Sequence, residues 1–211
     1  KRLKEAGITV VHVVSSKKFA LKAQDAGVDA VVAEGFEAGG HNGREETTTL
    51  CLIASVREAI DIPLIAAGGI GSGKAMLAAM ILGADGVQIG SRFLASYESS
   101  AHIDFKNRVL QAEEGETKLT LKELTPVRLL DNAFSKEIEA IYERKGTTEA
   151  LAAHLGRGRA KKGMFEGDLV NGELEVGQVS SMIRTIQPAG DVVREIWQEY
   201  QDALNNLQRL T

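Results

Sequence analysis

The chain has 211 residues, with 25 Lys plus Arg against 29 Asp plus Glu and a formal net charge of −4. That length and the 44% share of hydrophobic residues suit one large domain, or one domain with an appendage, and exclude a mostly disordered chain. The acidic balance argues against a general nucleic-acid binder. No apolar run approaches the ~20 residues of a membrane span. A single Cys cannot form an intrachain disulfide, which favours a reducing, cytoplasmic setting.

Residues 1–95 repeat a simple pattern of helix, glycine and short apolar strand. The strands are expected at 8–14, 30–33, 63–67 and 86–89. They are continuously apolar rather than alternating, which is typical of parallel strands covered on both faces. The pattern therefore predicts four strand–helix units of a parallel α/β fold.

From about Ser96 the charge density rises and helical patterns dominate. Helices are expected at 103–114, 135–144, 147–155, 176–187 and 189–209. We therefore expect three regions: the α/β region 1–95, a mainly helical domain 96–187, and a terminal helix in 188–211 that packs back on the α/β region.

A glycine-rich segment follows the third strand and leads into a helix. Residues 68–74 match the G-x-x-x-x-G-K part of an ATP-binding P-loop, but Ala75 stands where that loop needs a hydroxyl for magnesium. The alternative is the phosphate site of a (β/α)8 barrel, formed by the loops after the last two strands and a short helix N-terminus. It requires a second loop after the next strand, which Gly90 and Ser91 supply. We favour this second interpretation, in which free amides at the start of the helix and loops receive a phosphate.

A third loop, 34–43, follows the strand at 30–33 and opens at the same carboxyl edge of the predicted sheet. Its His41 lies among glycines, where the backbone lets an imidazole reach a ligand. Histidine exchanges protons near neutral pH, which suits a general acid or base. No spacing of His, Cys, Asp or Glu resembles a metal site, and we predict no metal. Cys51 is expected to be a buried, inert thiol.

Three of these segments occur in a family-like order: Glu34-Gly-Phe-Glu-Ala-Gly-Gly-His41, Ala66-Ala-Gly-Gly-Ile70 and Gln88-Ile-Gly-Ser-Arg-Phe93. With them, and with the Glu175-Val-Gly-Gln178 region, the chain resembles the nitronate monooxygenase (2-nitropropane dioxygenase) family over nearly its whole length. It is also similar to a sibling family, the flavin-dependent enoyl-acyl-carrier-protein reductase II.

The resemblance implies a TIM (β/α)8 barrel that binds FMN, of which this chain holds the last four strand–helix units, with an added helical domain. It implies that His41 is the catalytic residue. It places the flavin phosphate at Gly68, Gly69, Gly90 and Ser91. It implies that the remaining cofactor-binding residues are Ala38, Gly39, Gly40, Ala67 and Gln88.

Three functions remain open on this basis. The preferred one is oxidation of a small-molecule substrate, an alkyl nitronate, with O2, in which His41 binds or deprotonates the nitro compound. The second is reduction of an enoyl thioester with NAD(P)H and FMN, for which the basic segment 157–162 offers an approach to the carrier group. The third is a binding module without catalysis.

The third function arises because family members begin with about four further strand–helix units. An open half-sheet would expose an edge and an apolar face. We favour a longer parent protein over a homo-oligomer in which two chains cover the gap.

Overall fold

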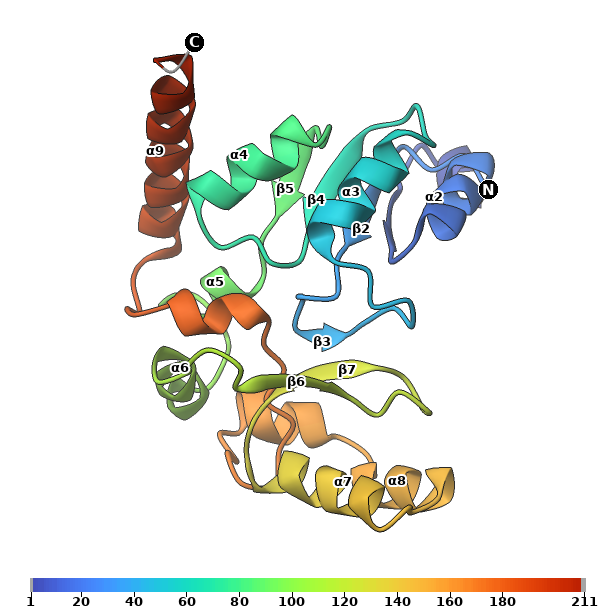
Figure 1. Cartoon of the computed structure of the whole chain (residues 1–211), viewed down its shortest axis with the longest axis vertical. Coiled ribbons are helices and arrows are strands. Elements are labelled where there is room, and N and C mark those ends of the chain that lie inside the picture. Colours follow the sequence, from blue (N-terminus) through green and yellow to red (C-terminus); the bar gives the residue numbers. More distant parts are fainter. Residues whose placement is uncertain (1, 210–211) are drawn as a thin grey trace. The chain divides into compact units, whose positions relative to one another are not determined.

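The computed structural model of the chain describes residues 2–209 (Figure 1). It consists of two compact units. The first contains residues 2–37, 45–89 and 193–209, and the second contains residues 38–44 and 90–192. The segment around His41 therefore belongs to the second unit, although the strands that precede and follow it in the sequence belong to the first.

The first unit is built on an open parallel sheet with the strand order β1-β2-β4-β5. The strands are β1 (Val11–Val14), β2 (Ala30–Glu34), β4 (Leu64–Ala67) and β5 (Gly86–Gln88). One face is covered by three helices (Figure 1): α2 (Lys17–Asp25), α3 (Thr49–Arg57) and α4 (Gly73–Ile81). The parallel α/β class and the four strands expected from the apolar runs are confirmed.

Burial differs between the central strands of this sheet and its first strand. Val31 and Ala33 of β2 are fully buried beneath the helices, together with Leu64 of β4. Val11 and Val13 of β1 remain 47% and 49% exposed. No described strand pairs with the second edge of β1. The sheet thus has the open edge and partly exposed apolar side chains that an unclosed parallel sheet produces.

Two further helices belong wholly or partly to the first unit. These are the short α1 (Arg2–Glu5) and the long α9 (Ala189–Gln208), whose residues from Val193 onward lie in this unit. The Glu199 carboxylate of α9 accepts a hydrogen bond of 2.8 Å from the backbone N–H of Gly73, at the start of α4. The terminal helix therefore contacts the α/β region through α4.

The second unit contains an antiparallel sheet of order β3-β7-β6, which the sequence analysis did not predict within the mainly helical region. Its strands are β3 (Gly40–His41), β7 (Val127–Leu130) and β6 (Thr117–Thr120). None is longer than four residues, and Lys118 and Arg128 interrupt their apolar pattern. Such short, charged runs do not show the alternation by which a strand is predicted.

Helical elements lie both before and after β6 and β7 in the sequence of this unit. They are α5 (Ser91–Leu94), α6 (Ile103–Leu110), α7 (Ala133–Glu143), α8 (Thr148–Leu155), the π-helix η1 (Lys161–Phe165) and the 3-10 helix η2 (Gln178–Met182). The expected helix over 176–187 is wrong, because only η2 forms there. Val176, Val179 and Ile183 are spaced like a helix face, yet they are buried from an irregular segment.

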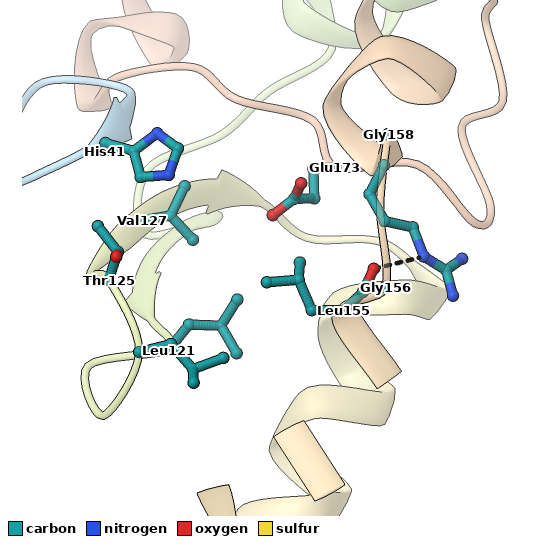
Figure 2. Close-up of a pocket in the computed structure, with 10 residues that line it drawn as sticks. His41, Leu121, Thr125, Val127, Leu155, Gly156, Gly158 and Glu173 are labelled. Atoms are coloured by element: carbon teal, nitrogen blue, oxygen red, sulfur yellow. Dashed lines mark hydrogen bonds between the residues drawn. The ribbon is translucent and has the colours of Figure 1, made fainter. Parts of the chain in front are cut away.

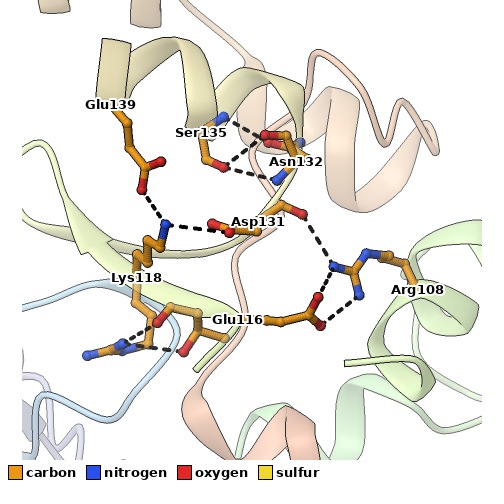
Figure 3. A network of polar contacts seen from close by, with 9 residues as sticks. Arg108, Glu116, Lys118, Asp131, Asn132, Ser135 and Glu139 are labelled. Carbon is orange, nitrogen blue, oxygen red and sulfur yellow. Dashed lines mark hydrogen bonds and ion pairs between the residues drawn. The ribbon is translucent and has the colours of Figure 1, made fainter. Parts of the chain in front are cut away.

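Asn132 joins β7, α7 and the segment 169–172. Figure 3 shows its contacts with Ser135 of α7. Its Oδ1 accepts from the Ser135 N–H at 2.9 Å, and Ser135 Oγ accepts from the Asn132 N–H at 2.9 Å, which makes a capping box for α7. The Asn132 amide also donates to the carbonyls of Leu169 and Gly172, at 3.0 and 2.8 Å. These bonds fix the chain immediately before Glu173.

Candidate active site

The carboxyl edge of the parallel sheet carries the first group of expected site residues. Ala67 of β4 is the register partner of both Glu34 and Gln88, so the ends of three strands are aligned. Gly68 follows with a φ of +84°, and a Cβ there would lie 2.6 Å from the carbonyl oxygen of Gly35. A larger residue at 68 would collide with backbone, which explains the glycine.

The loop at 68–69 is held by the N-terminus of α3. Thr49 Oγ1 lies 2.9 Å from the Gly68 carbonyl oxygen. The Glu37 carboxylate accepts hydrogen bonds from the N–H of Thr49 at 3.0 and 3.1 Å and from its hydroxyl at 2.8 Å. The carboxylate thus caps α3 and lies beside the space that a Gly69 side chain would enter.

The start of α4 is not free to receive a phosphate, and this part of the sequence prediction is wrong. The N–H of Ala75 donates to Ser72 Oγ at 3.3 Å, and the N–H of Gly73 donates to the Glu199 carboxylate. A Cβ at Gly73 would lie 2.1 Å from the backbone nitrogen of Tyr200. A carboxylate repels a phosphate at this point, so the structure also argues against an ATP-binding P-loop.

The start of the short helix α5 is different. Gly90 is its N-cap, and no side chain caps the helix. The φ of Gly90 is −102°, which any residue adopts, and a Cβ there would meet nothing within 4 Å. Ser91 Oγ accepts a hydrogen bond of 2.8 Å from the N–H of Gly177 and keeps its own O–H to donate. Open space, a short helix start and a free hydroxyl donor fit an anionic group such as a phosphate.

His41 lies on β3, where it pairs with Val127 of β7. The neighbouring residues Ala38, Gly39 and Gly40 pass close to the segment 175–177. A Cβ at Gly39 would lie 2.4 Å from the carbonyl carbon of Val176, and one at Gly40, whose φ is +75°, would lie 2.7 Å from Oε2 of Glu175. Two residues of the expected flavin site are therefore glycines because the chain packs tightly here.

Asn42 holds this loop in its conformation. Its side-chain amide donates to the carbonyls of Ala38 and Gly40, both at 3.0 Å, and its N–H donates to Pro126 at 2.8 Å. The backbone of β3 is thus fixed on both sides of His41.

His41 lines a cavity of about 170 Å³ within the second unit (Figure 2). The wall combines apolar side chains with polar and charged ones. The lining residues are His41, Leu121, Leu124, Thr125, Val127, Leu155, Gly156, Gly158, Arg159 and Glu173. Figure 2 shows the His41 ring and the Glu173 carboxylate directed toward the same space. An imidazole and a carboxylate that line one small cavity are groups that can transfer a proton.

Arg159 is fixed by backbone carbonyls. Its guanidinium donates to Leu155, His154 and Asn171 at 3.2, 3.1 and 2.8 Å. It also lies 4.8 Å from the centre of the Phe134 ring. The side chain therefore contributes a stationary positive charge to the cavity wall.

Glu173 and Glu175 are functional candidates that the sequence analysis did not name. Burial raises the pKa of both carboxyls, the neighbouring Glu175 raises that of Glu173 further, and His41 lowers both. The signal in the sequence was the alternation of two acids with the buried Leu174 and Val176, which is a strand pattern.

Three further points concern Cys51, metal ions and membrane-spanning helices. Cys51 is exposed, so the expectation of a buried thiol is wrong. Between residues 2 and 209 there is no group of three His, Cys, Asp or Glu side chains that would hold a metal ion. In the same part of the chain, no helix is both long and apolar enough for a membrane span.

The family model for nitronate monooxygenase matches residues 1–199. The chain belongs to the nitronate monooxygenase family. It is 33% identical over 205 residues to a protein named probable nitronate monooxygenase from Staphylococcus aureus, a match that covers 93% of this chain. The chain spans 57% of the length of that relative.

Two solved structures share the fold of this chain. FabK from Thermotoga maritima has a TM-score of 0.93 and 37% identity, over 100% of this chain and 67% of that one. Nitroalkane oxidase from Streptomyces ansochromogenes has a TM-score of 0.81 and 34% identity, over 98% and 61% of the two chains. The monooxygenase and oxidase names describe oxidoreductases, which agrees with the enzyme class expected from the sequence.

Proposed function

We propose that this chain is part of an FMN-dependent oxidoreductase that acts on small nitro compounds, with alkyl nitronates oxidised by O2 as the first candidate reaction. The observation that carries the proposal is the position of His41: it lines a small cavity together with Glu173, and it directly follows Gly39 and Gly40 of the motif that resembles the family. Membership of the nitronate monooxygenase family and the likeness to a nitroalkane oxidase support it.

The residues available for FMN fit a phosphate-bearing ligand. We assign the phosphate to Gly68 and Gly69 after β4 and to Gly90 and Ser91 after β5. The strands before these loops are adjacent and parallel, and the register pair Ala67–Gln88 lies within two residues of both loops. The open space at Gly90 and the free hydroxyl of Ser91 support this assignment.

The rest of the FMN site is assigned to Ala38, Gly39, Gly40, Ala67 and Gln88. Bound FMN would supply the electron-accepting ring system. In this proposal His41 accepts or holds a proton at an imidazole nitrogen, and the leucines and valine of the cavity contact the apolar part of the substrate.

Reduction of an enoyl thioester with NAD(P)H is the second candidate. A specific observation keeps it: Gly158 and Arg159 from the basic segment 157–162 line the same cavity as His41. The basic charge there is partly used within the chain, because Lys161 pairs with Glu166 at 2.9 Å and Arg159 binds carbonyls.

Anaerobic reduction of the bound flavin distinguishes the candidates. Bleaching of the flavin by alkyl nitronates and not by NAD(P)H supports the oxidase, and the reverse supports the reductase. We expect His41→Gln to retain FMN and to lose about 10²–10⁴-fold in turnover, the usual contribution of a general base. Protein purified without flavin, and unable to bind added FMN, would favour the binding module.

A further inference from the structure

Two leucines present apolar surface to the cavity beside His41. Leu124 lies in the turn between β6 and β7, and Leu155 is the last residue of α8. Both are partly buried against the core cluster around Phe134 and Ile138, and both line the cavity. In the view of Figure 2, Leu155 lies across the drawn space from the His41 ring. The core leaves part of each side chain uncovered, so this apolar surface is available to a ligand in the cavity.

The turn that carries Leu124 is held in one conformation. The Leu124 N–H donates to the Leu121 carbonyl at 3.0 Å. The Arg44 guanidinium donates to the carbonyls of Lys122 and Leu124, both at 2.7 Å. Leu121 has a φ of +55°, a left-handed conformation that a bulky side chain rarely adopts, and it is 1% exposed. Such strain persists only where the surrounding contacts maintain it, and it is concentrated at ligand sites. The fold therefore fixes Leu124 beside the cavity.

Leu155 is fixed by the end of α8. Nε of Arg159 donates to the Leu155 carbonyl at 3.2 Å. Gly156 follows with a φ of +61° and ends the helix, and Gly158 has a φ of +76°. Both glycines line the cavity, and a Cβ on either would meet nothing within 4 Å. Open space therefore adjoins this part of the wall, and Leu155 is the apolar side chain that the segment supplies to the cavity.

The size of the cavity limits what can lie between His41 and the two leucines. Its volume is about 170 Å³. An apolar cavity of roughly 150 Å³ holds a molecule of about six non-hydrogen atoms, such as benzene. A nitro group takes up three of these atoms, so about three or four carbons fit with it. A longer chain has to displace Leu124 or Leu155, and one methylene too many in an apolar pocket costs roughly 10–200-fold in kcat/KM.

We propose that Leu124 and Leu155 are specificity-determining residues: the nitro end of the substrate lies at His41, and the two leucines admit an alkyl chain of up to about four carbons. This proposal rests on the proposed function, because it takes the substrate to be an alkyl nitronate. The nitro group is placed at the polar side chains of the wall, and the alkyl chain is stabilised by burial against leucine. The site then prefers the nitronates of short nitroalkanes to those of long ones.

The first test compares turnover across chain length. We measure kcat/KM for the nitronates of nitroethane, 1-nitrobutane and 1-nitrohexane in the purified protein with FMN. The hexyl compound should be turned over at least about tenfold less efficiently than the butyl compound. Leu124→Ala and Leu155→Ala should each raise the hexyl-to-butyl ratio by roughly tenfold. Leu124→Phe should lower the butyl-to-ethyl ratio by roughly tenfold, which keeps the proposal testable if the smaller variants do not fold.

Leu110→Ala is the matched control. Leu110 is the last residue of α6, as Leu155 is of α8, and it is partly buried against a different core cluster outside the lining of this cavity. Thermal unfolding shows whether each variant is folded, and the control should leave both ratios unchanged. An unchanged hexyl-to-butyl ratio in a folded Leu124→Ala or Leu155→Ala variant contradicts the proposal. Equal turnover of the hexyl and butyl nitronates by the unmodified protein contradicts it as well.

The second test needs neither flavin nor turnover. Primary alkanamides share the planar head group of nitroalkanes, and butanamide, hexanamide and octanamide differ in chain length alone. Their dissociation constants are measured from NMR shifts of the backbone amides at 121–127 and 155–159. Butanamide should bind the unmodified protein at least about tenfold more tightly than octanamide, and the two Leu→Ala changes should reduce that difference. Tighter binding of octanamide, or no shift at these residues with any of the three amides, would overturn the proposal.

Together the two tests separate this inference from the function on which it rests. If no nitronate is turned over, the proposed function fails, and the alkanamides still decide whether the leucines limit chain length. Turnover that is equal at all chain lengths keeps the proposed function and removes the length limit.

Discussion

Replacing Gly90 by Ala should weaken FMN binding without weakening the fold. The φ of −102° suits Ala, and the added Cβ has no neighbour within 4 Å. Gly→Ala at such a position leaves stability unchanged or raises it by about 0.4–1 kcal/mol, because the unfolded chain loses freedom. If the flavin phosphate lies against Gly90, the methyl group enters its space. Overpacking of this kind costs about 1–3 kcal/mol, which is roughly 5–150-fold in affinity.

The assay is fluorescence titration of the apoprotein with FMN, combined with thermal unfolding of the same samples. Gly86→Ala is the matched control, since a Cβ there also meets nothing within 4 Å and Gly86 lies four residues earlier, in β5. We expect the control to bind FMN like the unmodified protein. Tight FMN binding by Gly90→Ala at unchanged stability would show that the phosphate lies elsewhere. A large loss of stability in that variant would contradict the open space found around Gly90.

Three further changes test the fold around the site. Asn132→Ala removes the capping box of α7 and two bonds to carbonyls, so it should destabilise the protein by about 2–4 kcal/mol in urea unfolding, and a loss below about 1 kcal/mol would refute this account. Gly73→Ala forces a Cβ against the α9 backbone and should cost at least about 1–3 kcal/mol, whereas an unchanged melting temperature would contradict that contact. Burial raises the pKa of Glu173 and Glu175, so the folded state keeps their protons longer than the unfolded chain. Stability should therefore fall as the pH rises from the ordinary carboxyl value of 4.5 through the raised values, and the double Glu→Gln variant should flatten that slope.

The first unit followed closely from the sequence because its strands are locally encoded. The two central strands, β2 and β4, are short apolar runs that are almost wholly buried, as this composition predicts. Local composition was therefore sufficient for the sheet and for the position of its loops.

The start of α4 shows where local reasoning fails. Its glycine-rich approach suggested free amides, but the acceptor for Gly73 is Glu199, which lies 126 residues further along the chain. The residues of the motif themselves do not indicate that a carboxylate from a distant helix binds there. Only the packing of α9 against α4 reveals that this helix start is closed to an anion.

The sheet of the second unit was not predicted, for a related reason. This sheet joins Gly40 and His41 to Val127 and Arg128, residues more than eighty positions away, through strands too short to be recognised by periodicity. Glu173 and Glu175 were overlooked with the segment that carries them, because the valine spacing that follows resembles a helix face. Their proximity to His41 depends on that long-range pairing and on the Gly163–Gly172 contact.

The proposed binding sites for the flavin phosphate and for the substrate differ in charge. A flavin phosphate is an anion and needs uncapped amides and hydroxyl donors, which Gly90 and Ser91 provide. The lining of the cavity beside His41 contains instead the carboxylate of Glu173. The residues assigned to the cofactor phosphate and those that surround His41 are therefore different, and each set can be changed separately.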